Sequence, residues 1–556
     1  MIVLKKVLPI LLRAIISAVI VFLMFWFALP AVNLHSAGFW TFLFWSLVVI
    51  LAVNFTGSLI SFFKSLKTGQ NVRVFPSVRN IFKSLGIPAL VVLGVLVLMI
   101  VFSGIFNVIG LEIFNATRYK DLITIHDGNF IEDVAELSMS QIPVVDRDSS
   151  MALGKRKLGE MSDLVSQFEI ADDYTQINYN DSPVRVTPLK YGDAVKWLYN
   201  QSEGIPGYLR VDMTTQEVSL IRLKEGIRYS ESEYFMRNIH RYLRFQYPTK
   251  IFADVSFEID DDGAPYWVAS TVEYRIGFWS GRDIGGVVLV NAVTGESAYY
   301  DVGDAPTWID QVYDADMVLQ QLVYNGKYRS GFWNSIFGQK GVLTPTEGYN
   351  YIALDDDVWL YTGMTSVVSD ESNVGFVLVN LRTKETRYYA VPGAEEFSAT
   401  DSAEGQVQHL GYEATFPILL NVGNRPTYFM SLKDSAGLVK MYAFVDVQQY
   451  QIVGTGTSVD LAREDYLKKL AADGQLDQPS VDTVEKTAVV LSVATAVVNG
   501  NSMYYIMLDD GSVISASINL SSDLPFLAPG DTVTATLSGM EAQSIMVTKA
   551  NFYPEG

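Results

Sequence analysis

Residues 287–302 read VVLVNAVTGESAYYDV, and this stretch contains the pattern from which much of the chain is built. The apolar run that ends before Asn291 predicts a β-strand. The Thr-Gly-Glu that follows is typical of a tight turn, where glycine readily adopts a positive φ. Residues 297–302 then predict a returning strand, whose two adjacent tyrosines point to opposite faces. The stretch is therefore expected to form a β-hairpin.

The hairpin pattern recurs along the chain. Three stretches share Val, then Asp or Asn, two residues, Thr, one residue and Glu: residues 209–217 (LRVDMTTQE), 288–296 (VLVNAVTGE) and 377–385 (VLVNLRTKE). A fourth stretch, residues 444–451 (FVDVQQYQ), keeps the Val and the Asp but lacks the Thr and the Glu. The Asp or Asn positions are 79, 89 and 66 residues apart. Recurrence on this scale predicts a duplicated supersecondary unit.

Each unit is expected to combine antiparallel strands with a helix. Further hairpin turns are predicted ahead of the later motifs, at residues 261–263, 355–357 and 422–424. Helices are predicted at residues 230–243, 304–323 and 460–471, and Asp304 is the expected N-cap of the second. Helices that pack on antiparallel sheets give an α+β fold class.

These motifs resemble the PepSY-type repeat of bacterial envelope proteins. The resemblance would cover residues 180–470, with Asn in place of the usual Asp in two copies. It rests on Val211-Asp212, on Val290-Asn291 with Thr294-Gly295-Glu296, and on Val379-Asn380 with Thr383 and Glu385. It implies a noncatalytic module that binds or restrains proteins, often peptidases.

Three apolar segments near the start of the chain predict transmembrane helices. Residues 14–33, 39–63 and 86–110 contain no Asp, Glu, Lys or Arg. About 20 apolar residues are enough to cross a bilayer as a helix. A cleaved signal peptide is the alternative for the first segment, but its apolar stretch is too long and no small-residue cleavage site follows it cleanly. We therefore expect a three-span anchor.

Charge predicts the orientation of this anchor. Residues 1–110 hold eight Lys or Arg and no acid, which leaves −28 for the rest of a chain whose net charge is −20. The basic residues flank the first segment or lie between the second and third: Lys5, Lys6, Arg13, Lys64, Lys67, Arg73, Arg79 and Lys83. By the positive-inside bias these parts are cytoplasmic, and residues after about 111 are extracytoplasmic.

Composition narrows the setting further. The 556 residues include no cysteine, and a large disulfide-free exterior is more typical of a bacterial cell envelope than of animal secretion. A strongly acidic exterior argues against nucleic acid as a partner, because phosphates require Lys and Arg. The expected partners are the membrane and another envelope protein.

The sequence predicts five segments. They are a three-span anchor (1–110), a polar helical neck (111–175), a tandem α+β repeat domain (176–471), a linker (472–483) and a small β-barrel (484–556). Strands of the barrel are predicted at residues 487–498, 502–508, 512–518, 532–537 and 544–549. With the PFLAPGDTV before its fourth strand, this last segment looks like an OB-fold, and such barrels bind oligonucleotides or sugars in some settings. Its only bases are Lys486 and Lys549, so a spacer or docking role is expected here in place of nucleic-acid binding.

Chemistry is sparse in the sequence. The four histidines are scattered, and neither a serine-nucleophile motif nor a phosphate-binding loop occurs, so no catalytic residue and no cofactor is predicted. Two acidic runs stand out: Asp260, Asp261 and Asp262, and Asp355, Asp356 and Asp357. As hairpin turns they need no further explanation, while Ca²⁺ binding and acid–base catalysis are the alternatives.

Aromatic residues supply the candidate partner-binding surface. Tyr328, Phe332, Trp333 and Phe337 lie among glycines in residues 324–339, where they are suited either to bind a partner or to cover a sheet edge. The sequence thus favours a noncatalytic scaffold or regulatory subunit anchored in the membrane.

Two other functions were weighed. One is a cell-wall or carbohydrate-active protein, with Asp261 and Asp356 in a cleft walled by Trp267 and Trp359. The other is a ligand sensor, for which the predicted cytoplasmic parts are too small to hold an output domain.

Overall fold

The computed structural model describes residues 2–67, 87–136, 141–354, 356–366, 369–475, 484–498, 501–538 and 541–550. The chain divides into two compact units, Met1–Tyr466 and Leu467–Gly556. The first unit holds the N-terminal helices and the repeats, and the second holds the C-terminal strands.

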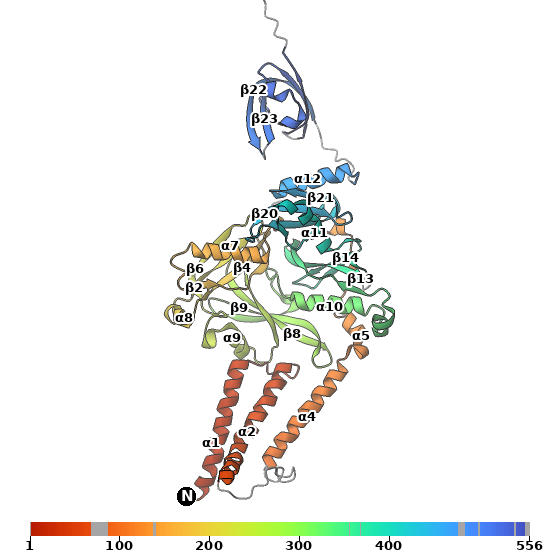
Figure 1. Ribbon diagram of the computed structural model, residues 1–556. Helices are drawn as coiled ribbons and strands as arrows, with labels where there is room; N and C mark the ends of the chain where they lie inside the picture. Colours follow the sequence, from red (N-terminus) through yellow and green to blue (C-terminus); the bar gives the residue numbers. More distant parts are fainter. Residues whose placement is uncertain are drawn as a thin grey trace, which may run out of the picture. The chain divides into compact units, whose positions relative to one another are not determined.

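Three apolar helices open the first unit: α1 (Ile2–Ala28), α2 (Ala37–Lys67) and α4 (Ile87–Ile109). They lie side by side in Figure 1, with α2 between its neighbours. Two of them are long and apolar enough to cross a membrane, at Leu11–Ala28 and Val91–Ile109, whereas the apolar stretch described in α2 is shorter, at Ala37–Val53.

The apolar side chains of the two candidate spans face outward. Only 6% and 11% of their residues are buried, so they differ from the core helices of a soluble domain. This supports membrane association for two helices, while the third span and the orientation stay predictions. Arg73, Arg79 and Lys83, which the orientation uses, lie outside the described residues.

In the part of the first unit that the structure describes, four mainly antiparallel sheets follow, each preceded by a helix (Figure 1). The first contains α7 (Arg147–Gly159), β2 (Phe168–Ile170), β3 (Thr175–Tyr179), β4 (Ser182–Tyr191), α8 (Ala194–Asn200), β5 (Ile205–Asp212) and β6 (Val218–Ile227). The second contains η2 (Phe235–Arg237), α9 (Ile239–Gln246), β7 (Phe252–Ile259), β8 (Pro265–Ile276), β9 (Ser280–Asn291) and β10 (Ser297–Asp301).

The third and fourth sheets repeat this plan. The third contains α10 (Ala315–Lys327), η4 (Asn334–Gly338), β11 (Leu343–Pro345), β12 (Asn350–Leu354), β13 (Asp357–Ser366), β14 (Ser369–Asn380), β15 (Thr386–Tyr389) and β16 (Gly393–Ala394). The fourth contains α11 (Glu396–Gln406), β17 (Glu413–Ala414), β18 (Ile418–Val422), β19 (Arg425–Lys433), β20 (Val439–Asp446) and β21 (Val453–Gly456), after which α12 (Val459–Ala472) leads into the second unit.

The hairpin at residues 287–302 forms as expected, and its position explains its composition. β9 pairs with β10 from Ser297↔Val290 to Asp301↔Gly286. Val288 and Val290 pack into a core shared with the first sheet, whereas Val287 and Leu289 pack into a core shared with α10 and the third sheet. A strand that is buried on both faces needs no polar alternation, which accounts for the unbroken VVLV.

Residues 111–175 do not form the expected polar neck and are instead built into the repeats. They contain α5 (Glu112–Lys120), β1 (His126–Asp127), α6 (Phe130–Asp133), α7 and β2. β1 adds to the third sheet in parallel with β15, and Ile123, Phe130 and Val144 are buried. The apolar residues of this segment are too scattered to show a period, yet tertiary contacts gather them into the core.

In its described residues, the second unit contains five β-strands. Its strands are β22 (Val484–Val498), β23 (Asn501–Leu508), β24 (Val513–Ser517), β25 (Thr532–Ser538) and β26 (Glu541–Thr548), and each overlaps a predicted strand. They pair in the closed order β22-β23-β24-β26-β25, in which β24 meets β26 through one parallel pair, Ser515↔Glu541. Val490, Ile506 and Val533 contribute to its core.

Candidate functional site

The repeated Asp or Asn stabilises a turn in every copy. The Oδ1 atom of Asn291 accepts hydrogen bonds from the backbone N–H groups of Val293 and Thr294, at 3.0 and 2.9 Å. The Oγ1 atom of Thr294 then accepts from the N–H of Glu296, at 3.2 Å. Equivalent bonds to Oδ1 occur at Asp212, Asn380 and Asp446. An Asp and an Asn serve this turn equally well, since only one acceptor oxygen is used.

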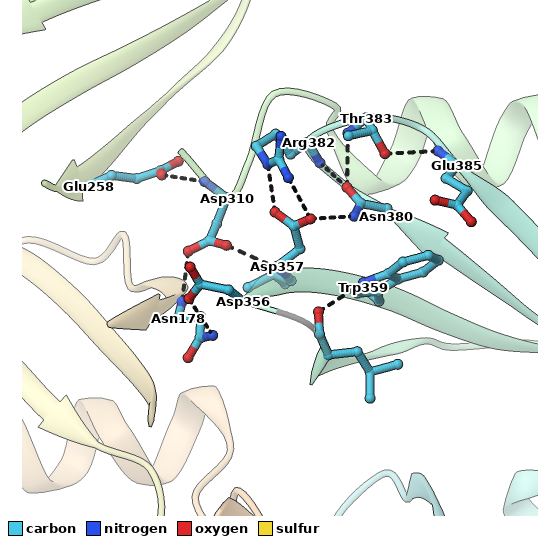
Figure 2. Close-up of polar contacts among 12 residues, drawn as sticks. Asn178, Glu258, Asp310, Asp356, Asp357, Trp359, Asn380, Arg382, Thr383 and Glu385 are labelled. Carbon is cyan, nitrogen blue, oxygen red and sulfur yellow. Dashed lines mark hydrogen bonds and ion pairs between the residues drawn. The ribbon is translucent and has the colours of Figure 1, made fainter. Parts of the chain in front are cut away.

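The neighbours of the remaining side-chain atom distinguish Asp from Asn. In the third copy, the Nδ2 of Asn380 donates to the Asp357 carboxylate at 2.8 Å, as Figure 2 shows. In the fourth, the Asp446 carboxylate pairs with Arg425 at 2.7 Å. A carboxylate thus stands beside the amide in one copy, and a guanidinium stands beside the acid in the other.

The predicted acidic runs are engaged in turns and ion pairs. The Oδ1 of Asp260 accepts from the N–H groups of Asp262 and Ala264, at 3.1 and 2.8 Å, so this residue closes the β7–β8 turn. Asp357 accepts two hydrogen bonds from Arg382, at 2.6 and 2.7 Å (Figure 2). Asp261 and Asp262 are exposed, and Asp355 lies outside the described residues.

Asp356 is the acid of these runs whose charge is most disfavoured. It adopts a left-handed conformation at φ 65°, and its Oδ1 accepts from Asn178 at 3.1 Å. Desolvation and the nearby charges of Asp181, Asp357 and Asp261 raise its pKa. Within the described residues, no group of three or more His, Cys, Asp or Glu is able to hold a metal ion.

A pair of buried acids beside these turns is not apparent from the sequence. Glu258 is 0% exposed and Asp310 is 2% exposed, and the Glu258 carboxylate accepts from the N–H of Asp310 at 3.0 Å. Desolvation raises the pKa of Glu258 to about 7, and burial together with the charge of Glu258 raises that of Asp310. Asp310 also accepts from the N–H groups of Asn178 and Val358 (Figure 2), so it joins the first three repeats.

A cavity of about 570 Å³ lies among the repeats. The start of α7 and strands β3 and β4 line it from the first repeat, β7 lines it from the second, and α10 and β12 line it from the third. Phe416, between β17 and β18, adds a wall from the fourth repeat. Its volume is typical of small-molecule sites.

Arg185 is the buried cation of this cavity. Val184 and Val186 of β4 pack into the core next to α7, so the intervening Arg185 points to the opposite face. Arg185 is 6% exposed and donates to the Oε1 of Gln176 at 2.9 Å and to the carbonyl of Tyr174 at 3.3 Å. Its Nε has no hydrogen-bond partner among the described residues, and no carboxylate there forms an ion pair with it.

The charge of Arg185 persists at neutral pH. Burial lowers the pKa of its guanidinium to about 10, which still leaves it protonated. A buried charge without an opposite charge is costly, because burial removes its hydration. In the sequence this residue is the single Arg within the strand SPVRVTPLKY. Without the fold, an Arg that points into a cavity cannot be told from an Arg on a solvent-exposed strand face.

Acidic side chains surround the mouth of the cavity. Four exposed carboxylates line it and have no ion pair among the described residues: Asp148, Asp173, Asp254 and Asp316. Two further acids of the lining are neutralised, Asp146 by Lys433 at 2.6 Å and Asp314 by Arg282 at 3.0 Å. The cavity therefore combines a buried positive charge with an exposed part that is mainly acidic and also holds Arg147.

No protein-family model matches the chain, and no curated protein matches it. The likeness of the repeats to PepSY-type modules and of the last segment to an OB-fold therefore stays a prediction. Function has to be argued from the geometry of the cavity, the turns and the exposed surfaces.

The four aromatic residues predicted to bind a partner divide into two pairs. Tyr328 is 1% exposed and its hydroxyl donates to Glu112, and Phe332 packs against the same small core. Trp333 and Phe337 are 61% and 78% exposed, and their rings stack 5.9 Å apart. Only the second pair is available to bind anything outside the fold.

The predicted carbohydrate cleft is not present in the described structure. Trp267 and Trp359 are 2% and 3% exposed and pack inside the sheets, so neither walls an open groove. The indole N–H of Trp359 donates to the carbonyl of Leu354 at 3.2 Å (Figure 2). Alternating residues of the two strands point these rings inward, which the turn sequences beside them do not reveal.

Proposed function

We propose that the protein is a membrane-anchored binding protein of the bacterial cell envelope. Three N-terminal helices anchor it, with the repeats and the C-terminal β-barrel outside the cytoplasm. The repeats act without catalysis, as a scaffold or regulatory subunit for another envelope component. The outward-facing apolar side chains of α1 and α4 and the basic residues that flank the apolar segments support this placement.

The observation that carries the proposal is the buried guanidinium of Arg185 in the cavity. A carboxylate or phosphate of a ligand in the cavity supplies the opposite charge that this guanidinium lacks. Such a site is costly to keep in a protein that binds nothing there, because a buried unpaired charge destabilises the fold. The repeats are thus the binding part of the molecule.

Two further features support the roles implied by the resemblances. All four copies of the Asp or Asn turn have the same two backbone hydrogen bonds to Oδ1, as expected of one duplicated module. The five strands of the second unit pair in a closed order, as expected of a small OB-like barrel. Its two bases in the described strands and loops, Lys486 and Lys549, pair with Asp510 and Asp531, which favours a spacer or docking role over nucleic-acid binding.

The test is thermal unfolding of the full chain in detergent, with acetate, succinate or inorganic phosphate added. At least one anion is expected to raise the Tm of the native protein and to leave that of Arg185→Met unchanged. Arg222→Met is the matched control, since Arg222 is exposed and pairs with Asp163 away from the cavity. The binding proposal is wrong if no anion raises the Tm of the native protein. It is also wrong if an anion raises the Tm of Arg185→Met as much as that of the native protein.

A further inference from the structure

We infer that the cavity takes a zwitterionic ligand, an amino acid or a short peptide, with its carboxylate at Arg185 and its ammonium group at the acidic rim. This rests on the proposed binding function and adds the ligand class. It follows from the placement of charge, since a buried cation and four exposed acids line one cavity.

The interior of the cavity recognises an anion. Arg185 offers an Nε that no described residue uses, and the neighbouring Gln176, which is 1% exposed, has an Nε2 without a partner as well. Both atoms are N–H donors, and they come from paired positions of β3 and β4, Gln176↔Arg185. Both atoms are closed off from the cavity surface as they stand, so a carboxylate in the cavity is held by the charge of Arg185.

The rim recognises a cation. Asp148 and Asp316 come from the first turns of α7 and α10, while Asp173 and Asp254 come from the segments beside β3 and in β7. These acids add nothing to the binding of a purely anionic ligand, whereas an ammonium group pairs with them, and the exposed Arg147 lies on the same lining. The four acids are exposed, so they act at the mouth and not in the interior.

The walls between the two ends suit an apolar or amide backbone. Tyr349 and Tyr351 contact each other edge to face at 5.5 Å, and Phe416 lies on the same lining. Aromatic rings give large contact area at small entropic cost. A volume of about 570 Å³ leaves room for a peptide of a few residues.

The experiment uses one mixture of tripeptides in three forms, with free ends, N-acetylated and C-amidated. Binding to the full chain in nanodiscs is measured by equilibrium dialysis. The free form is expected to bind at least tenfold more tightly than either blocked form. Asp316→Asn should weaken the free form and leave the acetylated form unchanged, while Asp262→Asn, at an exposed turn outside the cavity, should change neither.

The outcomes separate this inference from the proposed function. Equal affinity for the free and acetylated forms would overturn the zwitterion and keep an anion site. Equal affinity for the free and amidated forms would overturn the role of Arg185. If no form binds while acetate, succinate or phosphate still raises the Tm of the native protein, this inference fails and the proposed function stands. If none of these ligands binds, both fail.

A second inference concerns the loop around η4, and it rests on the proposed anchorage. The geometry points to Trp333, Ile336 and Phe337 lying in the interfacial layer of the bilayer, with lipid as their partner. Their side chains are 61%, 48% and 78% exposed, which is unusual for neighbouring large apolar groups. Aromatic residues are enriched at membrane interfaces because their rings are amphipathic.

Contacts tie this loop to the outer end of α4. Lys327 and Tyr328, which precede the loop, both bond to Glu112 at the start of α5. Glu112 comes three residues after Ile109, where α4 and its candidate span end. Phe114 of α5 is 69% exposed on this same segment. The exposed apolar surface of α4 thus continues through α5 toward the loop. Lipid that covers α4 therefore also reaches the loop.

Single cysteines test the second inference, because the chain has none of its own. A spin label is placed at Ile100→Cys on α4, at Trp333→Cys and at Phe397→Cys on α11, all at exposed apolar side chains. Collisions with oxygen report lipid, and collisions with a nickel chelate report water. Positions 100 and 333 are expected to show lipid contact in nanodiscs, and position 397 is expected to show water.

Two results would contradict this expectation in different ways. Water contact at position 333 with lipid contact at position 100 overturns the loop inference and leaves a protein partner as the occupant. Water contact at position 100 overturns the anchorage itself.

Discussion

At the residue scale, the chain shows how one turn accepts two side chains. The Oδ1 atom of Asp or Asn closes the turn in all four copies, so the recurring position could be predicted from the sequence. The choice between Asp and Asn could not be predicted from the sequence, because it depends on the neighbouring Asp357 in one copy and on Arg425 in another. Those neighbours come from other strands and are adjacent only in the fold.

The first prediction exchanges this side chain. Asn380→Asp is expected to lower the free energy of unfolding by about 1–3 kcal/mol, because it removes a donor and places a second carboxylate against the buried Asp357. Asn291→Asp should change it by less than about 0.5 kcal/mol, since the turn keeps its acceptor. Denaturant titration of the full chain measures both, and equal losses would contradict the explanation.

The second prediction concerns Glu258, whose pKa is raised from 4.5 to about 7 by burial. The unfolded chain releases this proton at lower pH than the folded chain does, so the stabilising contribution is complete below about pH 4.5 and is lost as the pH rises to 7. As the pH rises from 4.5 to 7, the loss of this contribution lowers the free energy of unfolding by at most about 3 kcal/mol.

Glu258→Gln is the matching variant, because an amide also bonds to the N–H of Asp310. Its free energy of unfolding is expected to fall less than that of the native protein between pH 5 and pH 7. Glu225→Gln, at an exposed position, should keep the native slope. An unchanged slope in Glu258→Gln would show that this carboxyl is not the group that titrates.

At the element scale, the helix predicted at residues 460–471 matches α12 to within one residue at each end, whereas the other two predicted helices begin later than expected. The second predicted helix, over residues 304–323, instead begins at Ala315, where the side chain of Asp314 accepts from the N–H of Met317 at 2.8 Å. The residues before it are held outside a helix because Asp310 is buried between repeats and accepts from Asn178 and Val358. Tertiary contacts thus override a local helix signal.

A third prediction tests the turn between β9 and β10. Gly295 has φ 77°, and a Cβ there would overlap the ring of Tyr229, so Gly295→Ala should lower the free energy of unfolding by more than about 1 kcal/mol. In the first copy the same position is Gln216, at φ 64°, and Gln216→Gly should cost less than about 0.5 kcal/mol. Similar losses in the two variants, measured by denaturant titration, would contradict a conformational cause.

At the scale of the whole molecule, the sequence predicted the repeats and the strands of the second unit, while the cavity stayed hidden. The cavity takes residues from all four repeats, and Arg185 and Asp316 are 131 positions apart in the chain. Residues 111–175 were misjudged for a related reason, because β1 reaches the third sheet across more than two hundred residues. Contacts at such separation leave no local pattern.

A fourth prediction addresses topology. Asp261→Cys, at an exposed turn, is expected to react with a membrane-impermeant maleimide in intact cells, and Lys6→Cys is expected to react only after the cells are opened. The chain has no native cysteine, so labelling reports these positions alone. The reverse pattern would place the repeats in the cytoplasm.

The most direct test of the central claim is the structure of the full chain soaked with 4-iodobenzoate, whose iodine is located by anomalous scattering. The carboxylate is expected within hydrogen-bond distance of Arg185, with the iodine toward Tyr349 and Tyr351. A cavity without iodine at saturating probe, or a carboxylate bound away from Arg185, would contradict the claim that this cavity is a binding site for anionic groups.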